Sequence, residues 1–180
     1  FTLPLLALGT GSYRVTAHTQ MQARPMGTTF DALAHLGARV EELGEPGHLP
    51  VTIRSGRGAA SVLQVAGDAS SQFLSGLLLI APCLPDGLTI HLTTDLVSRP
   101  YVDLTIAVMA SFGAIVEQPD DRTFSVEPGG YAATRYAIEA DASAASYPLA
   151  AAAVCGGSVT VSGLRGDALQ GDAAFAEVLA

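Results

Sequence analysis

The sequence predicts an α/β fold made of repeated βαβαββ units, each about 75 residues long. Two observations support this fold class. Similar segments recur at that spacing, and within one period apolar helical stretches alternate with short strand-like runs. Counted in this frame, both ends of the chain fall inside an element. We therefore expect repeats that are incomplete at both ends.

The internal repeat is visible in two pairs of short motifs. The tripeptide Asp-Ala-Ser occurs at residues 68–70 and again 73 residues later, at 141–143. The dipeptide Arg-Pro occurs at 24–25 and again 75 residues later, at 99–100. Each Asp-Ala-Ser motif is followed by an apolar stretch, a cysteine and a strand-like run. Because the order of these features is kept, a repeated structural unit explains them best.

The predicted elements follow from this pattern, in chain order. They are helix 1–8, helix 70–80, strand 88–92, helix 100–111, strand 114–118, strand 123–126, strand 158–161 and a last helix at 175–180. Asp68 and Ser70 are suited to cap the helix at 70–80, and Pro100 suits the first turn of the next. Gly37 and Gly113 are the kind of residue that ends a helix.

Composition limits the functional classes open to the chain. Its 180 residues are 49% hydrophobic, which is enough to bury a core. All nine basic residues are arginine, and 17 acidic residues give a net charge of −8. This sign of charge argues against non-specific nucleic-acid binding, so no nucleic-acid partner is expected. An anionic ligand has to be held by local geometry, and no lysine is present to form a Schiff base.

Neither a membrane segment nor a metal site is predicted. The longest apolar run, 73–82, is much shorter than the roughly 20 residues that span a bilayer. The two cysteines, Cys83 and Cys155, form no CxxC pair and have no neighbouring histidine cluster. We therefore expect a protein of a reducing, cytoplasmic compartment, without a disulfide framework or zinc.

The segment 67–72 is the most informative candidate site. It places Ser70, Ser71, Gln72 and free backbone N–H groups at a predicted helix start, where the helix dipole attracts anions. One reading is a phosphate-binding site, and the other is an ordinary Ser/Asp helix cap. Asp68 opposes phosphate binding unless its side chain points away. The second copy has alanines in place of Ser71 and Gln72, so we expect it only to cap its helix.

A similar set of groups opens the next predicted helix. Ser98, Arg99 and Tyr101 offer a hydroxyl, a guanidinium and a phenol. Arg24 holds the equivalent position one repeat earlier. A cation at a helix N-terminus opposes the dipole by about 0.3 to 1 kcal/mol, so an anionic ligand would explain it. A surface ion pair is the alternative.

These stretches resemble the enolpyruvyl transferase family, and within it the 5-enolpyruvylshikimate-3-phosphate synthases. GDASSQFLSGLLLIAP (67–82) resembles their Ser-Ser-Gln helix start. LVSRPYVDLT (96–105) is similar to their Ser-Lys-Pro-Tyr segment, with Arg99 in place of lysine. QARPMG (22–27), EADASAASYPLAAAA (139–153) and ALQGD (168–172) match further segments in the same order. The resemblance covers essentially the whole chain.

The resemblance implies a fold, a reaction and a set of binding residues. The fold is an inside-out α/β barrel in two domains, of which 1–139 form most of the shikimate-phosphate-binding domain and 140–180 begin the other. The reaction transfers the enolpyruvyl group of phosphoenolpyruvate to the 5-hydroxyl of shikimate 3-phosphate, with no cofactor and no metal. By position, Ser70, Ser71 and Ser98 hold the phosphate of shikimate 3-phosphate, and Tyr101 lies against its ring. Gln72 bridges both substrates, Arg24 contacts phosphoenolpyruvate, and Arg99 is a secondary candidate.

Several of the family's catalytic motifs match nothing in this sequence. They include its N-terminal lysine, its Gly-Asn-Ala-Gly-Thr segment and its proton-transferring aspartate. We therefore expect an internal fragment of a longer parent enzyme, with no catalytic residue of its own, that needs the remainder of the parent for activity. Two alternatives stay open: a UDP-N-acetylglucosamine enolpyruvyl transferase, and a non-catalytic paralogue or binding module.

Overall fold

The structure is a computed structural model that describes residues 1–56, 60–68, 70–166 and 168–179. It consists of two compact units, Phe1–Ala133 and Thr134–Ala180. Two residues of the predicted pattern lie outside the described residues. They are Ala69, in the first Asp-Ala-Ser motif, and Ala180, at the end of the last predicted helix.

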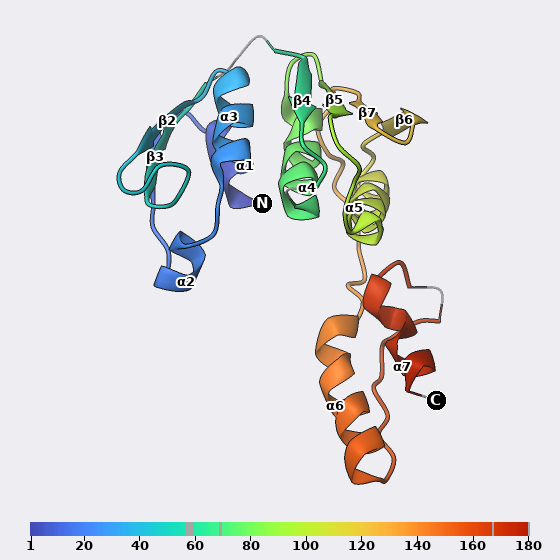
Figure 1. Ribbon diagram of the computed structural model, residues 1–180. Helices are drawn as coiled ribbons and strands as arrows, with labels where there is room; N and C mark the ends of the chain where they lie inside the picture. The colour runs from blue at the N-terminus through green and yellow to red at the C-terminus, as the bar shows by residue number, and fades with distance from the viewer. Residues whose placement is uncertain (57–59, 69, 167, 180) are drawn as a thin grey trace. The chain divides into compact units, whose positions relative to one another are not determined.

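One complete repeat lies in the first compact unit. Its elements are β4 (Val62–Val65), α4 (Ser71–Ile80), β5 (Leu88–Leu92), α5 (Arg99–Ser111), β6 (Val116–Asp120) and β7 (Thr123–Val126), as Figure 1 shows. The strands form one sheet in the order β4-β5-β7-β6, with β4 parallel to β5 and the other pairs antiparallel. The predicted βαβαββ unit is thereby confirmed. Its first strand, β4, was not among the predicted segments.

The preceding repeat has the same strand order. It contains α1 (Thr2–Ala7), β1 (Ser12–Val15), a short α2 (Thr19–Gln22), α3 (Gly27–His35), β2 (Arg39–Glu42) and β3 (Val51–Arg54). Its sheet runs β1-β3-β2, with both strand pairs antiparallel. This order corresponds to β5-β7-β6 of the complete repeat. The sequence repeat is therefore also a structural one.

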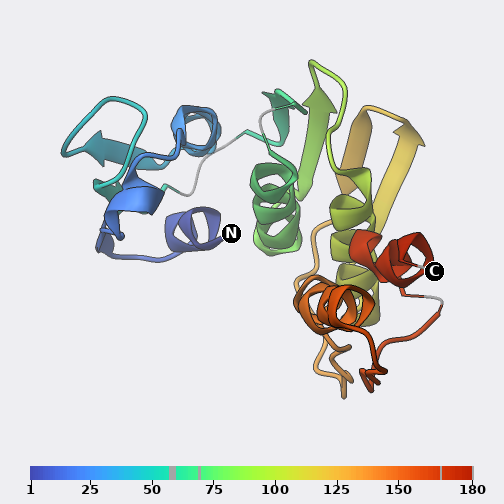
Figure 2. The same cartoon turned by 60° about the horizontal axis from the view of Figure 1, so that its bottom comes forward.

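Each repeat has its own hydrophobic core, and helices cover one face of each sheet. In the complete repeat α4 and α5 lie side by side against the sheet, as Figures 1 and 2 both show. Strand β5 alternates as an amphipathic strand should, with Leu88, Ile90 and Leu92 buried. Helix α1 packs against both α3 and α4, and so joins the two repeats. This packing positions the N-terminal ends of α4 and α5.

Most predicted element ends are confirmed, and one strand is shifted. Gly37 and Gly113 follow α3 and α5 with φ angles of 86° and 84°, which glycine adopts without strain. The strand predicted at 114–118 is instead β6, at Val116–Asp120. Ala114 is still part of the helix end, because its N–H donates to the carbonyl of Met109 at 3.0 Å. The extended backbone therefore begins two residues later.

The second compact unit contains α6 (Ala142–Cys155), a 3₁₀ turn (Gly171–Ala174) and α7 (Phe175–Val178). The strand predicted at 158–161 is wrong, since these residues form no strand. A strand requires a neighbour with which to exchange backbone hydrogen bonds, and the described part of this unit contains none. No helix in the described ranges is both long and apolar enough to cross a membrane.

Candidate functional site

A cavity of about 540 Å³ lies where α4 and α5 begin. It is lined by Phe1, Arg24, Ser70, Ser71, Gln72, Ser75, Ser98, Tyr101, Leu104 and Thr105. Six of the seven predicted site residues are in this set, although they come from three separate stretches of sequence. Arg99 is the one predicted site residue that does not line the cavity. The folding of the two repeats therefore brings the predicted residues to one place.

The start of α4 supplies three of the lining residues. Ser70 caps the helix, because its Oγ accepts a hydrogen bond from the N–H of Gln72 at 3.2 Å. This bond uses the oxygen of Ser70 as an acceptor and leaves its hydroxyl hydrogen to donate to a ligand. Ser71 follows in the first turn and is 7% exposed. Together with the positive end of the helix dipole, these hydroxyls favour an anion.

Ser98 precedes α5 in a left-handed backbone conformation, with a φ of 55°. Such a conformation is uncommon for a residue other than glycine. Its side chain makes no capping hydrogen bond to α5, although Ser98 stands at the cap position. Ser98 lines the cavity, and its hydroxyl is not used to cap the helix. Tyr101, one turn further along α5, lines the same cavity.

Arg24 is the one charged side chain among the described residues that line the cavity. The prediction that it marks a helix start is wrong, because α3 begins at Gly27 and Arg24 lies in the preceding loop. Across the described ranges, the Arg24 guanidinium makes no hydrogen bond or ion pair with a protein group. Asp68 is exposed and is not a lining residue, so its charge does not face the cavity. The cavity is therefore locally positive in a chain of net negative charge.

Arg99 points elsewhere, although it is the repeat equivalent of Arg24. Its Nε donates to Oδ1 of Asp103 at 2.7 Å, and its Nη2 contacts Gln118. Its guanidinium also lies 5.8 Å from the ring centre of the buried Phe124. These contacts tie α5 to the sheet. The two repeat-related arginines therefore occupy different surroundings, which their sequences do not reveal.

Two polar residues of the cavity were missed by the sequence analysis. The Oγ of Ser75 on α4 and the Oγ1 of Thr105 on α5 are 2.8 Å apart. Thr105 donates its hydroxyl hydrogen to the carbonyl of Tyr101 at 2.8 Å, so Ser75 is the donor in the bond between the two helices. The helical period was the available signal, because Ser75 and Thr105 each lie four residues after a predicted site residue.

The second Asp-Ala-Ser motif has a different surrounding. Asp141 caps α6, with its Oδ1 accepting from the N–H of Ala144 at 3.0 Å, as predicted. The hydroxyl of Ser143 donates to the carboxylate of Asp172. An anion would meet this carboxylate, so the second motif lacks the electrostatics of the first. The described residues contain no group of His, Cys, Asp and Glu side chains arranged to hold a metal ion.

Comparison with known proteins gives the family. The family described as EPSP synthase (3-phosphoshikimate 1-carboxyvinyltransferase) matches residues 1–180. The chain belongs to the EPSP synthase family. The protein named 3-phosphoshikimate 1-carboxyvinyltransferase from Erwinia tasmaniensis is 44% identical over 176 residues, and that from Bordetella petrii is 44% identical over 184. Both matches cover 97% of this chain and 41% of the relative, so the chain spans about two fifths of the length of these EPSP synthases.

Solved structures show the same fold. The EPSP synthase from Acinetobacter baumannii aligns with a TM-score of 0.67 at 21% identity, over 85% of this chain and 33% of that one. The enolpyruvyl transferase NikO from Streptomyces tendae aligns with a TM-score of 0.59 at 17% identity, over 83% and 34%. At these identities the likeness concerns the fold alone. The expected enolpyruvyl transferase architecture of α/β repeats is confirmed.

Proposed function

We propose that the protein carrying this chain transfers the enolpyruvyl group of phosphoenolpyruvate to the 5-hydroxyl of shikimate 3-phosphate, in the cytoplasm. Membership of the EPSP synthase family supports this reaction. Within this chain, the cavity at the starts of α4 and α5 is the main support for the proposal. Its hydroxyls, its helix dipole and Arg24, which has no ion-pair partner among the described residues, together form a site suited to a phosphorylated substrate.

The six lining residues that the sequence predicted each have a proposed role. Ser70, Ser71 and Ser98 donate hydrogen bonds to the phosphate of shikimate 3-phosphate, because hydroxyl donors from two helix starts converge on the cavity. Tyr101 lies against the shikimate ring, and Gln72 contacts both substrates. Arg24 attracts phosphoenolpyruvate. Arg99 does not line the cavity, and it donates to Asp103 and Gln118, so we assign it a structural role instead of a binding role.

A titration of the 180-residue chain with shikimate 3-phosphate tests these assignments. We expect saturable binding that is lost in the double variant Ser71→Ala, Gln72→Ala. The matched control is Ser61→Ala, Gln64→Ala, which removes the same groups from exposed positions outside the cavity. Binding that survives in the cavity variant, or disappears equally in the control, would contradict the assigned site.

Substrate binding and catalytic turnover are separate expectations for the 180-residue chain. We expect no phosphate release from phosphoenolpyruvate and shikimate 3-phosphate by the 180-residue chain alone, because its sequence lacks matches to the family's acid/base motifs. Turnover by the purified chain would contradict this expectation. A complete parent protein that is folded but inactive would instead favour a non-catalytic paralogue. The family match removes the support for the UDP-N-acetylglucosamine alternative.

A further inference from the structure

Two loops carry the hydroxyls of the candidate site, and both begin at the same edge of the four-stranded sheet. One loop follows β4 and leads to Ser70, and the other follows β5 and leads to Ser98. Because β4 and β5 are parallel neighbours, these loops leave the sheet side by side. The distance between the two hydroxyls therefore depends on what holds one loop against the other.

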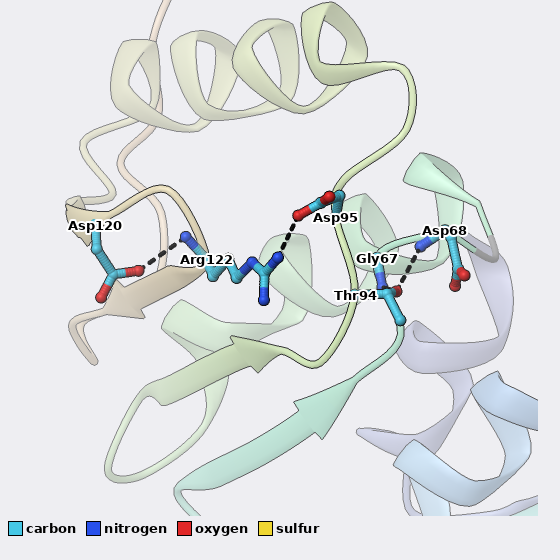
Figure 3. A network of polar contacts seen from close by, with 6 residues as sticks. All are labelled: Gly67, Asp68, Thr94, Asp95, Asp120 and Arg122. Carbon is cyan, nitrogen blue, oxygen red and sulfur yellow. Dashed lines mark hydrogen bonds and ion pairs between the residues drawn. The ribbon is translucent and has the colours of Figure 1, made fainter.

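Thr94 and Gly67 make that connection. The Oγ1 of Thr94 accepts hydrogen bonds from the N–H of Gly67 at 2.9 Å and from the N–H of Asp68 at 3.1 Å, as Figure 3 shows. The carbonyl of Gly67 accepts from the N–H of Val97 at 3.2 Å. Both backbone polar groups of the buried Gly67 are thus satisfied by the other loop. We use the name Gly67–Thr94 clasp for these three hydrogen bonds.

The close approach of the two loops requires glycine at position 67. A Cβ atom there would lie 2.7 Å from the carbonyl oxygen of Thr94 and 3.0 Å from that of Asp95. Neither oxygen belongs to a flexible side chain, so any larger residue would force the backbones apart. The absence of a side chain at Gly67 and the hydroxyl of Thr94 therefore act together.

An outer ion pair holds the β5–α5 loop to the turn between β6 and β7. Arg122, from that turn, contacts the carboxylate of Asp95, and the backbone N–H of Arg122 donates to Oδ1 of Asp120 at 2.8 Å (Figure 3). The side chains of Arg122 and Asp95 are 55% and 90% exposed. Exposed pairs of this kind contribute about 0 to 1 kcal/mol. The Gly67–Thr94 hydrogen bond is partly buried and the Asp68–Thr94 bond is exposed, so we expect the bond at Gly67 to contribute most to holding the two loops together.

We propose that Thr94 is a positioning residue for phosphate binding, which acts by fixing the spacing between Ser70 and Ser98 through the Gly67–Thr94 clasp. This inference rests on the proposed function of the cavity. Thr94 does not line the cavity and so does not touch the substrate. Its effect is geometric: an unheld β4–α4 loop presents the Ser70 hydroxyl at varying distances from Ser98, and a phosphate cannot then engage both.

The experiment compares three variants in the full 180-residue chain. Thr94→Val removes the acceptor at nearly constant volume, and Thr94→Ser retains it. Thr89→Val is the matched control, because its hydroxyl bonds Ser125 at 3.2 Å between β5 and β7, outside the cavity. Two quantities are measured for each variant: the dissociation constant for shikimate 3-phosphate by calorimetry, and amide hydrogen exchange at Gly67 and Asp68 by NMR.

We expect Thr94→Val to raise the dissociation constant by about threefold to tenfold and to speed exchange at Gly67 by a similar factor, as loss of a hydrogen bond predicts. Thr94→Ser and Thr89→Val should both stay within about twofold of the unchanged chain. Equal affinity in Thr94→Val, or equal weakening in Thr94→Ser or in the control, would overturn the inference.

Failure of the proposed function has a different signature. A folded, unchanged chain that binds no shikimate 3-phosphate contradicts the proposed binding site at the level of this chain. Amide hydrogen exchange at Gly67 and Asp68 then tests the Gly67–Thr94 clasp independently of binding. Unchanged exchange at Gly67 and Asp68 in Thr94→Val would overturn the clasp as well, whatever the chain binds.

Discussion

Ser98 combines a strained backbone with a side chain that makes no capping hydrogen bond. Its left-handed conformation costs about 1 kcal/mol relative to glycine, and its hydroxyl makes no cap bond that would offset this cost. Strain that is retained beside a cavity is typical of a binding site. The geometry of Ser98 therefore favours a role in ligand binding over a role in starting α5.

Replacing Ser98 by glycine should change stability and binding in opposite directions. We expect Ser98→Gly to raise the free energy of unfolding by up to about 1 kcal/mol, because glycine adopts this φ without strain. The same change should weaken binding of shikimate 3-phosphate. Urea denaturation and calorimetry measure the two effects. Ser98→Ala is the control, since it loses the hydroxyl and keeps the strain. If Ser98→Gly had no higher free energy of unfolding than Ser98→Ala, backbone strain at Ser98 would be contradicted.

Tyr131 should make the stability of the chain depend on alkaline pH. Burial, together with the nearby negative charge of Cys83, raises the pKa of Tyr131 to about 12. Its hydroxyl also donates to the carbonyl of Leu79 on α4 at 2.8 Å. The unfolded chain loses this proton first, at a pKa near 10. The contribution of Tyr131 is therefore complete below pH 10 and is lost as the pH rises to 12.

Chemical denaturation at several pH values between 9 and 12 measures this effect. No lysine titrates in that range, because the chain has none. We expect stability to fall less steeply in Tyr131→Phe than in the unchanged chain. Tyr147→Phe is the control, since Tyr147 is 78% exposed. Equal slopes in all three proteins would show that Tyr131 does not carry the dependence.

At the scale of the elements, α4 and α5 are joined beneath the cavity by the Ser75–Thr105 hydrogen bond. Ser75 is 1% exposed, so replacing Thr105 would leave its hydroxyl buried without this partner. The bond therefore holds α4 and α5 together, as the Gly67–Thr94 clasp holds the loops that precede them. Both connections act on the same pair of binding elements.

A double-mutant cycle with Ser75→Ala and Thr105→Val measures this coupling. We expect a coupling energy of about 0.5 to 1.5 kcal/mol in the free energy of unfolding, and coupling in shikimate 3-phosphate affinity as well. The comparison cycle uses Thr89→Val and Ser125→Ala, whose hydroxyls meet across β5 and β7. For that pair we expect a coupling energy in the free energy of unfolding but none in the affinity for shikimate 3-phosphate. Coupling in affinity for the comparison pair would argue against a special role for Ser75 and Thr105.

At the scale of the whole molecule, the candidate site belongs to one compact unit. All described residues that line the cavity lie in Phe1–Ala133, and both hydrophobic cores do as well. In the described part of Thr134–Ala180, the buried hydrophobic residues are Ala142 and Ala145. So little buried apolar area does not offset the entropy of ordering this many residues.

We therefore expect a shortened chain, residues 1–133, to keep the stability of the 180-residue chain. Its dissociation constant for shikimate 3-phosphate should stay within about twofold. The peptide 134–180 should show little helical circular dichroism by itself, because isolated helices of this length are marginal in water. Loss of binding on removal of 134–180 would mean that the second unit contributes to the site.

Local sequence was sufficient to predict most elements of the complete repeat, with β4 as the exception. The strands at Leu88–Leu92 and Thr123–Val126 match the prediction, because alternation and turn residues act over a few positions. The predicted strand at 158–161 failed for the opposite reason. A strand exists only with a partner, and partners are decided by the fold and not by the segment itself.

Neighbouring residues were enough to predict the repeat, the starts of α4 and α5 and the hydroxyl-rich segments, since capping and periodicity depend on neighbours in the chain. Which arginine faces the cavity depended instead on contacts between residues far apart in the sequence. Arg24 and Arg99 each precede a proline. Arg99 nevertheless contacts Asp103, Gln118 and Phe124, whereas Arg24 has no hydrogen-bond or ion-pair partner within the described residues. The Gly67–Thr94 clasp is of the same kind. Its groups lie 27 and 26 residues apart, and only the pairing of β4 with β5 brings them within hydrogen-bonding distance.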